Sequence, residues 1–209
     1  MPPKLKICGI TTLEDARYCA AAGADYLGFI QYEDSPRYVA PETAREIIGW
    51  MYGPEAVGVF VNATAEVVNE VAEAAGFALV QLHGTEPPEV CARIEHPVIK
   101  ALHVTPLTTA ADLRALMTLY APQVAFFLLD TSKTGLWGGT GASFDWAVAQ
   151  DLARDFPLFL AGGLGTGNIA EAVRTVQPYG IDLSSSVEAT PGVKDFDKLT
   201  AFFDMYHTL

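Results

Sequence analysis

Two chemically reactive side chains stand at the ends of short apolar segments, each where the chain must turn. The segment 5–8 ends in the thiol of Cys8, and Gly9 follows at once. The segment 125–130 ends in the carboxyl group of Asp130. A thiol reacts as the thiolate, and a carboxyl group exchanges protons readily. Each also has a structural interpretation, because a lone cysteine on a strand usually belongs to the core and an aspartate often caps a helix or anchors a loop.

The alternation of side chains along a strand predicts where these groups point. Lys6 and Cys8 share one face, and the two apolar residues of their segment take the other. We expect the apolar face to pack on helices, so that Lys6 and Cys8 point inward. Lys6 would then lie one inward step below Cys8, about 7 Å away, where a cation favours the thiolate. Asp130 projects inward by the same argument, and Asp182 is a candidate partner for Lys6.

Short β-rich segments alternate with amphipathic segments along the whole chain, which indicates repeated βα units. The expected strands are 5–8, 26–30, 56–61, 79–83, 98–102, 125–130, 158–161 and 181–184. The expected helices are 13–22, 41–50, 65–75, 88–94, 110–120, 146–155, 168–177 and 196–206. Thr64 and Thr109 are expected N-caps, and Gly23 and Gly76 are expected to end their helices.

Eight βα units in 209 residues predict an α/β fold, a single-domain (β/α)8 TIM barrel over residues 1–209. An open doubly wound sheet is the alternative, but no GxGxxG motif follows the first expected strand. In a barrel the chemistry lies at the C-terminal ends of the strands, where Cys8 and Asp130 stand.

Composition limits the possible partners. The formal net charge of −12 argues against nucleic acid and against an anionic membrane surface, since both are bound by clustered lysine and arginine. Three widely spaced cysteines without a CxxC motif predict no disulfide framework. The sequence shows no signal-peptide pattern, no apolar run of roughly 18 residues and no metal-ligand spacing. We therefore expect a cytoplasmic protein with no metal site.

An anion site is expected from two loops. The stretch AGGLGTGN, with Gly162 and Gly163, lies between an expected strand and an expected helix, and exposed backbone N–H groups at a helix N-terminus bind anions. Ser184, Ser185 and Ser186 follow the eighth expected strand. In (β/α)8 barrels the loops after strands seven and eight often bind phosphate.

Two further side chains are candidates for a substrate site. Arg37 lies in an expected rim loop, where its planar guanidinium suits a carboxylate or a phosphate. An ion pair with Glu33 or Asp34 is the structural alternative. His83 ends the fourth expected strand, and it is either a site residue or a buried supporting histidine.

With these residues in view, the chain resembles the phosphoribosylanthranilate isomerase family of tryptophan biosynthesis. The resemblance rests on the ordered motifs KICGIT, LGFI with SPRYV, VGVFVN, VQLHG, LLDT with GGTGASFDW, AGGL, GIDLSSSVE and PGVKD. It implies a barrel without cofactor, whose small-molecule substrate is phosphoribosylanthranilate. It further implies that Cys8 is the general base, that Asp130 is the general acid, and that Arg37 anchors the anthranilate carboxylate, with Gly162, Gly163 and Ser184 to Ser186 around the phosphate. His83 and Asp182 are placed with the substrate.

The resemblance implies an Amadori rearrangement, in which an aminoaldose becomes an aminoketose by acid–base catalysis. The chain departs from the family pattern at Thr12, Ala142 and Ser186, where the family has arginine or asparagine, lysine, and glycine. Ser186 carries a Cβ, so we expect it to adopt a negative φ and to offer its hydroxyl to the phosphate.

Two other classes of function stay open. One is a different phosphosugar enzyme on the same barrel, such as an epimerase or indole-glycerol-phosphate synthase. A metal requirement or a catalytic lysine would distinguish such an enzyme from the isomerase. The other is a non-catalytic phosphate-binding barrel, against which the presence of Cys8 and Asp130 argues.

Overall fold

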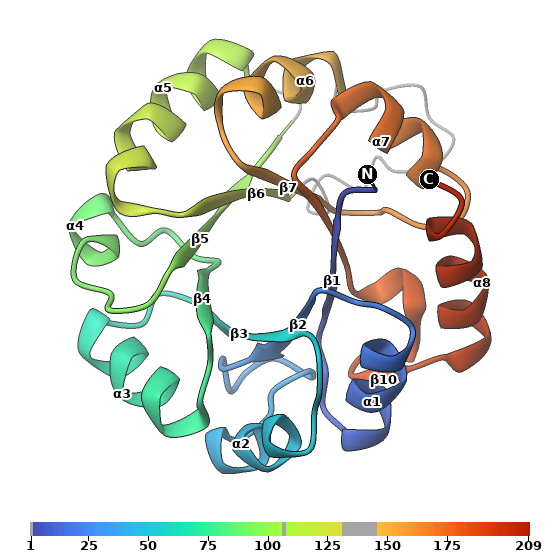
Figure 1. Cartoon of the computed structure of the whole chain (residues 1–209). Coiled ribbons are helices and arrows are strands. Elements are labelled where there is room, and N and C mark those ends of the chain that lie inside the picture. The colour runs from blue at the N-terminus through green and yellow to red at the C-terminus, as the bar shows by residue number, and fades with distance from the viewer. Residues whose placement is uncertain (1, 106–107, 131–145) are drawn as a thin grey trace.

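Eight parallel strands close into a barrel that is surrounded by helices (Figure 1). The computed structural model describes residues 2–105, 108–130 and 146–209. The strands are β1 (Lys4–Cys8), β2 (Tyr26–Ile30), β3 (Glu55–Phe60), β4 (Leu79–Leu82), β5 (Val98–His103), β6 (Phe126–Asp130), β7 (Leu158–Ala161) and β8 (Gly180–Leu183). Each pairs in parallel with the next, and β8 pairs with β1. This closure confirms the predicted (β/α)8 barrel, and the open-sheet alternative is wrong.

Helices follow the strands on the outside of the barrel (Figure 1). They are α1 (Leu13–Ala21), α2 (Pro41–Gly49), α3 (Ala65–Ala75), α4 (Pro88–Cys91), α5 (Ala110–Tyr120), α6 (Trp146–Asp155), α7 (Ile169–Val176) and α8 (Phe196–Tyr206). Four of the eight match their expected bounds at both ends, and α4 is the clear exception. It ends three residues early, because the N–H groups of Arg93 and Ile94 bond to carbonyl groups three residues back, in tighter turns.

The expected N-caps at Thr64 and Thr109 and the expected helix end at Gly76 are confirmed. Thr64 accepts a hydrogen bond from the N–H of Val67, and Thr109 forms a capping box with Asp112. Gly76 ends α3 in the left-handed region at φ 80°, which a residue without a Cβ adopts at no steric cost.

The apolar core has an inner part and an outer part. The inner part fills the barrel and contains Tyr26, Val57, Leu79, Ile99, Ala101, Leu128, Phe159 and Ala161. Leu5 and Ile7 point the other way and are fully buried in the layer between strands and helices. Lys6 is also fully buried, on the inward face of β1. The expected alternation along β1 is therefore confirmed.

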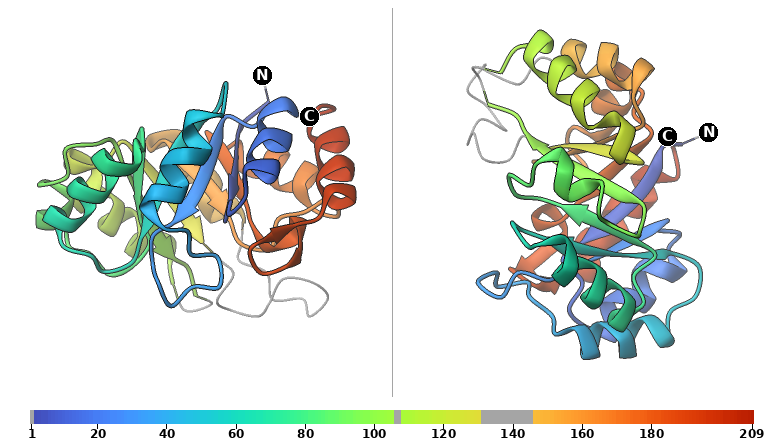
Figure 2. Two further views of the ribbon diagram at one scale, coloured as in Figure 1. Left: turned by 90° about the horizontal axis from the view of Figure 1, so that it is seen from below. Right: turned by 90° about the vertical axis from the view of Figure 1, so that its left-hand side faces the viewer.

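A small hairpin after β8 was not predicted. Its strands are β9 (Glu188–Thr190) and β10 (Val193–Lys194), joined by a turn in which Gly192 has φ 86°. The hairpin and the loop after β2 project from the same side of the barrel, and the two chain ends lie on the opposite side (Figure 2). In the described part of the chain, no helix is long and apolar enough to span a membrane.

We predict that Gly180→Ala lowers the free energy of unfolding by about 1–3 kcal/mol. A Cβ at Gly180 would lie 2.4 Å from the ring of Phe159 and 3.0 Å from the carbonyl oxygen of Lys4, so the inner core would have to shift. Urea unfolding measures the difference. The control is Gly49→Ala in α2, where an added Cβ meets nothing within 4 Å and stability should not fall. Equal stability of the two variants would contradict the prediction.

Candidate active site

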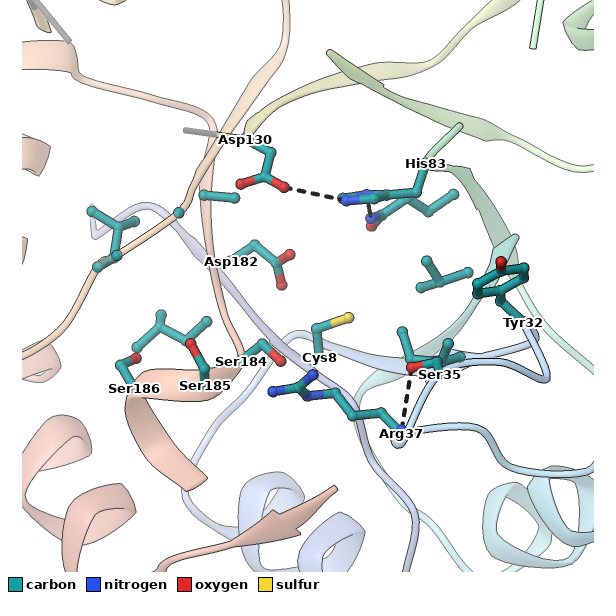
Figure 3. Close-up of a pocket in the computed structure, with 18 of the residues that line it drawn as sticks. Cys8, Tyr32, Ser35, Arg37, His83, Asp130, Asp182, Ser184, Ser185 and Ser186 are labelled. Atoms are coloured by element: carbon teal, nitrogen blue, oxygen red, sulfur yellow. Dashed lines mark hydrogen bonds and ion pairs between the residues drawn. The ribbon is translucent and has the colours of Figure 1, made fainter. Parts of the chain in front are cut away.

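A pocket of about 310 Å³ opens at the C-terminal ends of the strands (Figure 3). All the residues predicted for the site line it, and they come from the ends of six strands and the loops that follow them. They are Cys8, Arg37, His83, Asp130, Gly162, Gly163, Asp182, Ser184, Ser185 and Ser186. The sequence did not single out Tyr32, Ser35 and Gln81, which also line the pocket. The structure therefore brings the predicted residues together, while their roles remain predictions.

Cys8 stands above a buried ion pair. Lys6 and Asp182 are register partners on β1 and β8, and the Lys6 Nζ lies 3.0 Å from the Asp182 Oδ1. The expected pairing of Lys6 with Asp182 is confirmed. The two groups compensate each other's charge inside the barrel, where an unpaired charge is very costly.

The charge state of Cys8 depends on opposing influences. Burial is the largest, and it raises the pKa of the Cys8 thiol above its ordinary value. Lys6 acts in the opposite direction and favours the thiolate, as the sequence predicted, but it does not outweigh burial. The sequence showed the cation but not how completely the thiol is buried.

Space for the Cys8 sulfur is provided by Gly28 on the neighbouring strand. Gly28 is the register partner of Cys8 on β2. A Cβ at Gly28 would lie 2.7 Å from the Cys8 Sγ and 3.1 Å from the Lys6 Nζ. The absence of a side chain at Gly28, in the LGFI motif, therefore leaves the space that the thiol and the ammonium group occupy. The sequence did not indicate this role.

Arg37 is held by Glu188, at the start of the unpredicted hairpin. Its Nε lies 2.9 Å from Glu188 Oε1, and its Nη2 lies 2.6 Å from Glu188 Oε2. Glu188 also binds Lys194 at 3.1 Å, and Lys194 donates to the carbonyl oxygen of Cys8 at 2.6 Å. The structural alternative, that Arg37 forms an ion pair, is confirmed. Its partner is Glu188 and not Glu33 or Asp34. Burial opposes the charge on Glu188, yet the two cations outweigh it and lower its pKa.

Asp130 lies on another side of the pocket from Cys8 and faces His83 (Figure 3). The His83 Nε2 lies 3.2 Å from the Asp130 Oδ2. The other ring nitrogen of His83 lies 2.8 Å from the side-chain amide of Gln81. Gln81 therefore orients the ring of His83, which in turn contacts the carboxyl group of Asp130.

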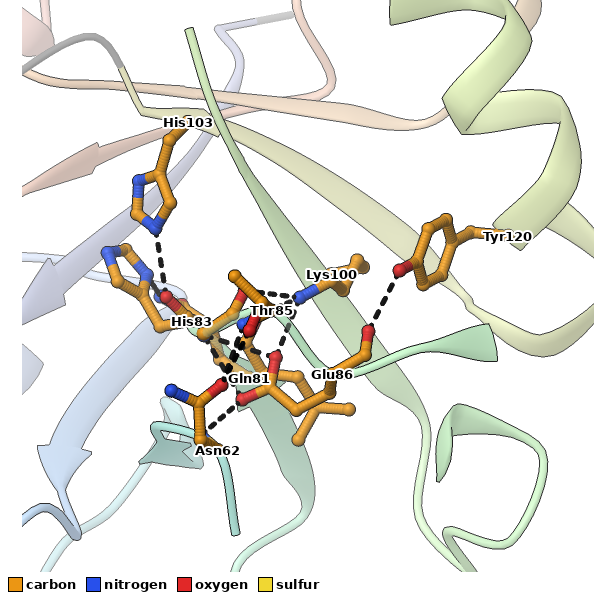
Figure 4. A network of polar contacts seen from close by, with 10 residues as sticks. Asn62, Gln81, His83, Thr85, Glu86, Lys100, His103 and Tyr120 are labelled. Carbon is orange, nitrogen blue, oxygen red and sulfur yellow. Dashed lines mark hydrogen bonds and ion pairs between the residues drawn. The ribbon is translucent and has the colours of Figure 1, made fainter. Parts of the chain in front are cut away.

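The turn after His83 is fixed by a second buried ion pair (Figure 4). Glu86 lies 2.7 Å from Lys100 and accepts hydrogen bonds from the backbone N–H groups of Asn62 and Gly84. The hydroxyl of Tyr120 donates to the backbone carbonyl of Glu86 at 2.8 Å. These contacts hold the backbone on which His83 stands, so the ring is placed by a rigid support.

The two loops expected to bind phosphate lie beside each other. A Cβ at Gly165 would lie 3.6 Å from the Cβ of Ser186. Asn168 holds the glycine-rich loop, because its side chain accepts from the N–H of Gly165 and donates to the carbonyl oxygen of Gly163. Ser186 lies in a short 3₁₀ helix, η3 (Ser185–Val187), with a negative φ, as expected.

Comparison with known proteins identifies the family. The profile of the family described as "N-(5'phosphoribosyl)anthranilate (PRA) isomerase" matches residues 5–205. The chain is 46% identical over 205 residues to an N-(5'-phosphoribosyl)anthranilate isomerase of Trichlorobacter lovleyi, with 95% of each chain covered. The chain belongs to this family.

Solved structures of phosphoribosylanthranilate isomerases agree with this assignment. The Thermotoga maritima enzyme has a TM-score of 0.87 to this chain at 39% identity, covering 99% of this chain and 100% of its own. A phosphoribosylanthranilate isomerase in complex with reduced 1-(o-carboxyphenylamino)-1-deoxyribulose 5-phosphate has a TM-score of 0.85 at 37% identity, with the same coverage. The family resemblance predicted from the motifs is confirmed.

Departures from the isomerase family pattern have local explanations where the structure describes them. Thr12 is the N-cap of α1, and its hydroxyl accepts a hydrogen bond from the N–H of Asp15 at 3.1 Å. Ser186 fits its short helix without a left-handed conformation. Ala142 lies outside the described residues. Neither described departure changes a residue predicted to take part in chemistry.

We predict that Gly28→Ala lowers kcat at least about tenfold, because a displacement of about 1 Å at a reacting group can cost a hundredfold in rate. The added Cβ must displace the Cys8 sulfur or the Lys6 ammonium group. Steady-state kinetics and urea unfolding of the same samples separate lost activity from lost folding. The matched control, Gly49→Ala, should keep the parental kcat. Unchanged turnover in a folded Gly28→Ala variant would show that the sulfur position is not critical.

Proposed function

We propose that this chain converts N-(5'-phosphoribosyl)anthranilate to 1-(2-carboxyphenylamino)-1-deoxyribulose 5-phosphate, with Cys8 as the base and Asp130 as the acid. The observation that carries the proposal is their placement on different sides of one pocket, between the glycine- and serine-rich loops and Arg37 (Figure 3). The reaction needs two titrating groups on opposite sides of the sugar, and the pocket offers them.

The first step opens the ribose ring. Asp130 gives its proton to the ring oxygen, the bond between that oxygen and C1 breaks, and the nitrogen lone pair forms the Schiff base. Asp130 is left as a carboxylate. His83, whose Nε2 lies 3.2 Å away, stabilises that carboxylate by donating a hydrogen bond.

The second step moves a proton from carbon. The Cys8 thiolate removes the proton from C2, and the electron pair of that bond forms the C1–C2 double bond of an enolamine as the Schiff base nitrogen is neutralised. The enolamine tautomerises to the ketone. Lys6 lies below Cys8 and opposes the effect of burial on its pKa, so it favours the thiolate. The cationic Schiff base adds a second positive charge near the sulfur at the moment when the base acts.

Binding is divided between the two ends of the pocket. The backbone N–H groups near Gly163 and the hydroxyl groups of Ser184 to Ser186 suit the phosphate. Arg37 suits the anthranilate carboxylate, because Glu188 binds its Nε and Nη2 and fixes the direction of the guanidinium. The complex of the related isomerase supports this division, since its ligand carries both a carboxyphenyl group and a phosphate.

The competing phosphosugar chemistry receives less support. A synthase of the indole-glycerol-phosphate type would need a catalytic lysine, and the described lining of the pocket contains none. Lys6 is fully buried and paired with Asp182. The proposed cytoplasmic location is supported by Cys8, Cys19 and Cys91, which are all free thiols, as expected in a reducing compartment.

Replacing Cys8 by alanine should reduce turnover of phosphoribosylanthranilate by about 10²–10⁴-fold, with little effect on substrate binding. A base acts in the transition state and need not hold the ground state. Loss of anthranilate-type fluorescence measures turnover. The matched control is Cys91→Ala, which removes another buried thiol, away from the pocket, and should retain parental activity. If Cys8→Ala turns over nearly as fast as the parent, Cys8 is not the base.

The pH dependence should follow from the raised pKa of Cys8. Because the folded-state pKa lies above the ordinary value, the thiolate is lost as the pH falls through that raised value. Asp130 must be protonated at the same time, so the effect of Cys8 alone is measured in Asp130→Asn, whose residual turnover has no titrating acid at this position. In that variant we expect kcat/KM to increase with pH across the neutral range, measured with proton transfer rate-limiting. A value that is constant, or that decreases, between about pH 6 and about pH 8 in that variant would contradict a thiolate base.

Arg37→Ala should weaken binding of anthranilate-bearing ligands more than binding of a simple sugar phosphate. A hydrogen bond between charged groups contributes about 1.5–3 kcal/mol, which corresponds to about tenfold to a hundredfold in affinity. Calorimetry with a reduced product analogue and with ribose 5-phosphate compares the two ligand types. Equal losses for both would assign Arg37 to the phosphate or to loop structure.

A further inference from the structure

Two histidines and a carboxylate converge beside the pocket from three neighbouring strands. His83 follows β4, while His103 and Asp130 end β5 and β6 as register partners. The Asp130 Oδ2 lies 3.2 Å from His83 Nε2 and 3.7 Å from His103 Nδ1. One ligand atom from each of the three residues lies within 4.8 Å of the other two. Spacing along the sequence does not reveal this cluster, because only the barrel brings the three strand ends together.

The hydrogen bonding of His103 leaves a nitrogen without a role in the reaction. Its Nε2 donates to the backbone carbonyl oxygen of His83 at 3.0 Å, so in the neutral ring Nδ1 carries the lone pair (Figure 4). Nδ1 is buried, and no atom of the described residues forms a hydrogen bond with it. It faces the Asp130 carboxyl group across 3.7 Å, which is too long for a hydrogen bond. A lone pair directed at a carboxylate favours a cation between them.

His83 reaches the same kind of outer support after a turn of one side chain. The amide nitrogen of Gln81 lies 2.8 Å from its Nδ1, so Gln81 donates to Nδ1, and Nε2–H faces Asp130. When the Gln81 amide turns by 180°, Nδ1–H donates to the amide oxygen and the lone pair of Nε2 faces Asp130 instead. Histidines that bind metals almost always donate their second N–H to a backbone carbonyl or another acceptor, and the His83 carbonyl oxygen and the turned Gln81 amide supply these two acceptors.

We propose that His83 Nε2, His103 Nδ1 and an Asp130 carboxylate oxygen bind a divalent transition-metal ion of the zinc class, and that this ion inhibits the enzyme. A tetrahedral ion with bonds of about 2.0–2.2 Å needs ligand atoms about 3.4 Å apart. The two distances from Asp130, 3.2 Å and 3.7 Å, are close to this value, and the two histidine nitrogens, which lie within 4.8 Å of each other, approach when the ion binds. The fourth coordination position faces the pocket, which is lined by His83 and Asp130 and gives the ion access.

Inhibition follows from the identity of the third ligand. A metal-bound Asp130 carboxylate has no proton to give to the ring oxygen. The inhibitory half of the inference rests on the proposed function, whereas metal binding does not. The net charge of −12 further favours the capture of a cation.

The test uses Co²⁺ as a spectroscopic probe that is independent of activity. Titration of the metal-free protein should give visible d–d absorption of a tetrahedral ion, without the thiolate charge-transfer band expected if Cys8 were a ligand. His103→Gln removes the ligand nitrogen but retains a donor toward the His83 carbonyl group. It should lower the affinity for Co²⁺, and for Zn²⁺ by calorimetry, at least about tenfold. His103→Asn serves as a second variant if the first does not fold.

The matched control is His207→Gln, which alters an exposed histidine near the C-terminus and should leave metal affinity unchanged. No tetrahedral signal, or a signal that His103→Gln does not weaken, would overturn the proposed site. In activity assays Zn²⁺ should inhibit, a chelator should restore turnover, and His103→Gln should resist inhibition while retaining metal-free turnover. Metal binding that depends on His103 but does not inhibit would uphold the site and overturn the inhibitory half, together with the role of Asp130 as the acid.

Discussion

The charge on Lys6 is the constraint on which the site depends. Its ammonium group is fully buried in the barrel, and it remains there because Asp182, its register partner across the closure between β1 and β8, compensates it at 3.0 Å. Breaking such a pair by removing one partner typically costs 3–5 kcal/mol. The pair therefore favours one register at the closure, and that register places Cys8 and Ser184 side by side at the rim. The same buried charge lies beneath the thiol and opposes the effect of burial on its pKa.

A second buried charge links the rim loops to this arrangement. Glu188 binds Arg37 from the loop after β2 and Lys194 from β10, and Lys194 reaches back to the backbone carbonyl of Cys8. The proposed base and the proposed anchor for the substrate carboxylate are thus joined through a single carboxylate. Displacing the hairpin would move both groups together, which explains why a segment that touches no reacting atom belongs to the functional unit.

Sequence periodicity predicted the barrel well, because alternation along strands and the 3.6-residue repeat along helices follow from burial of one face of each element. The site residues were predicted by position, since the strand ends of a barrel meet at one rim. Distances across the barrel were not predictable. Arg37 and Glu188 are 151 positions apart, and nothing local indicates that they meet. The early end of α4, the hairpin and the buried state of Cys8 likewise depend on tertiary packing that a single sequence does not display.

The distribution of charge across the pocket separates the two proposed catalytic roles. Lys6, Arg37 and Lys194 gather around Cys8, where positive charge favours a thiolate. Asp130 has two histidines, His83 and His103, as neighbours. Burial raises the pKa of Asp182, and electrostatic repulsion by Asp130 adds to that increase. One side of the pocket therefore suits a base and the other an acid. On the acid side the unpaired Nδ1 of His103 faces the Asp130 carboxyl group across 3.7 Å. A metal ion bound there would take the place of the proton that Asp130 needs in order to act as the acid.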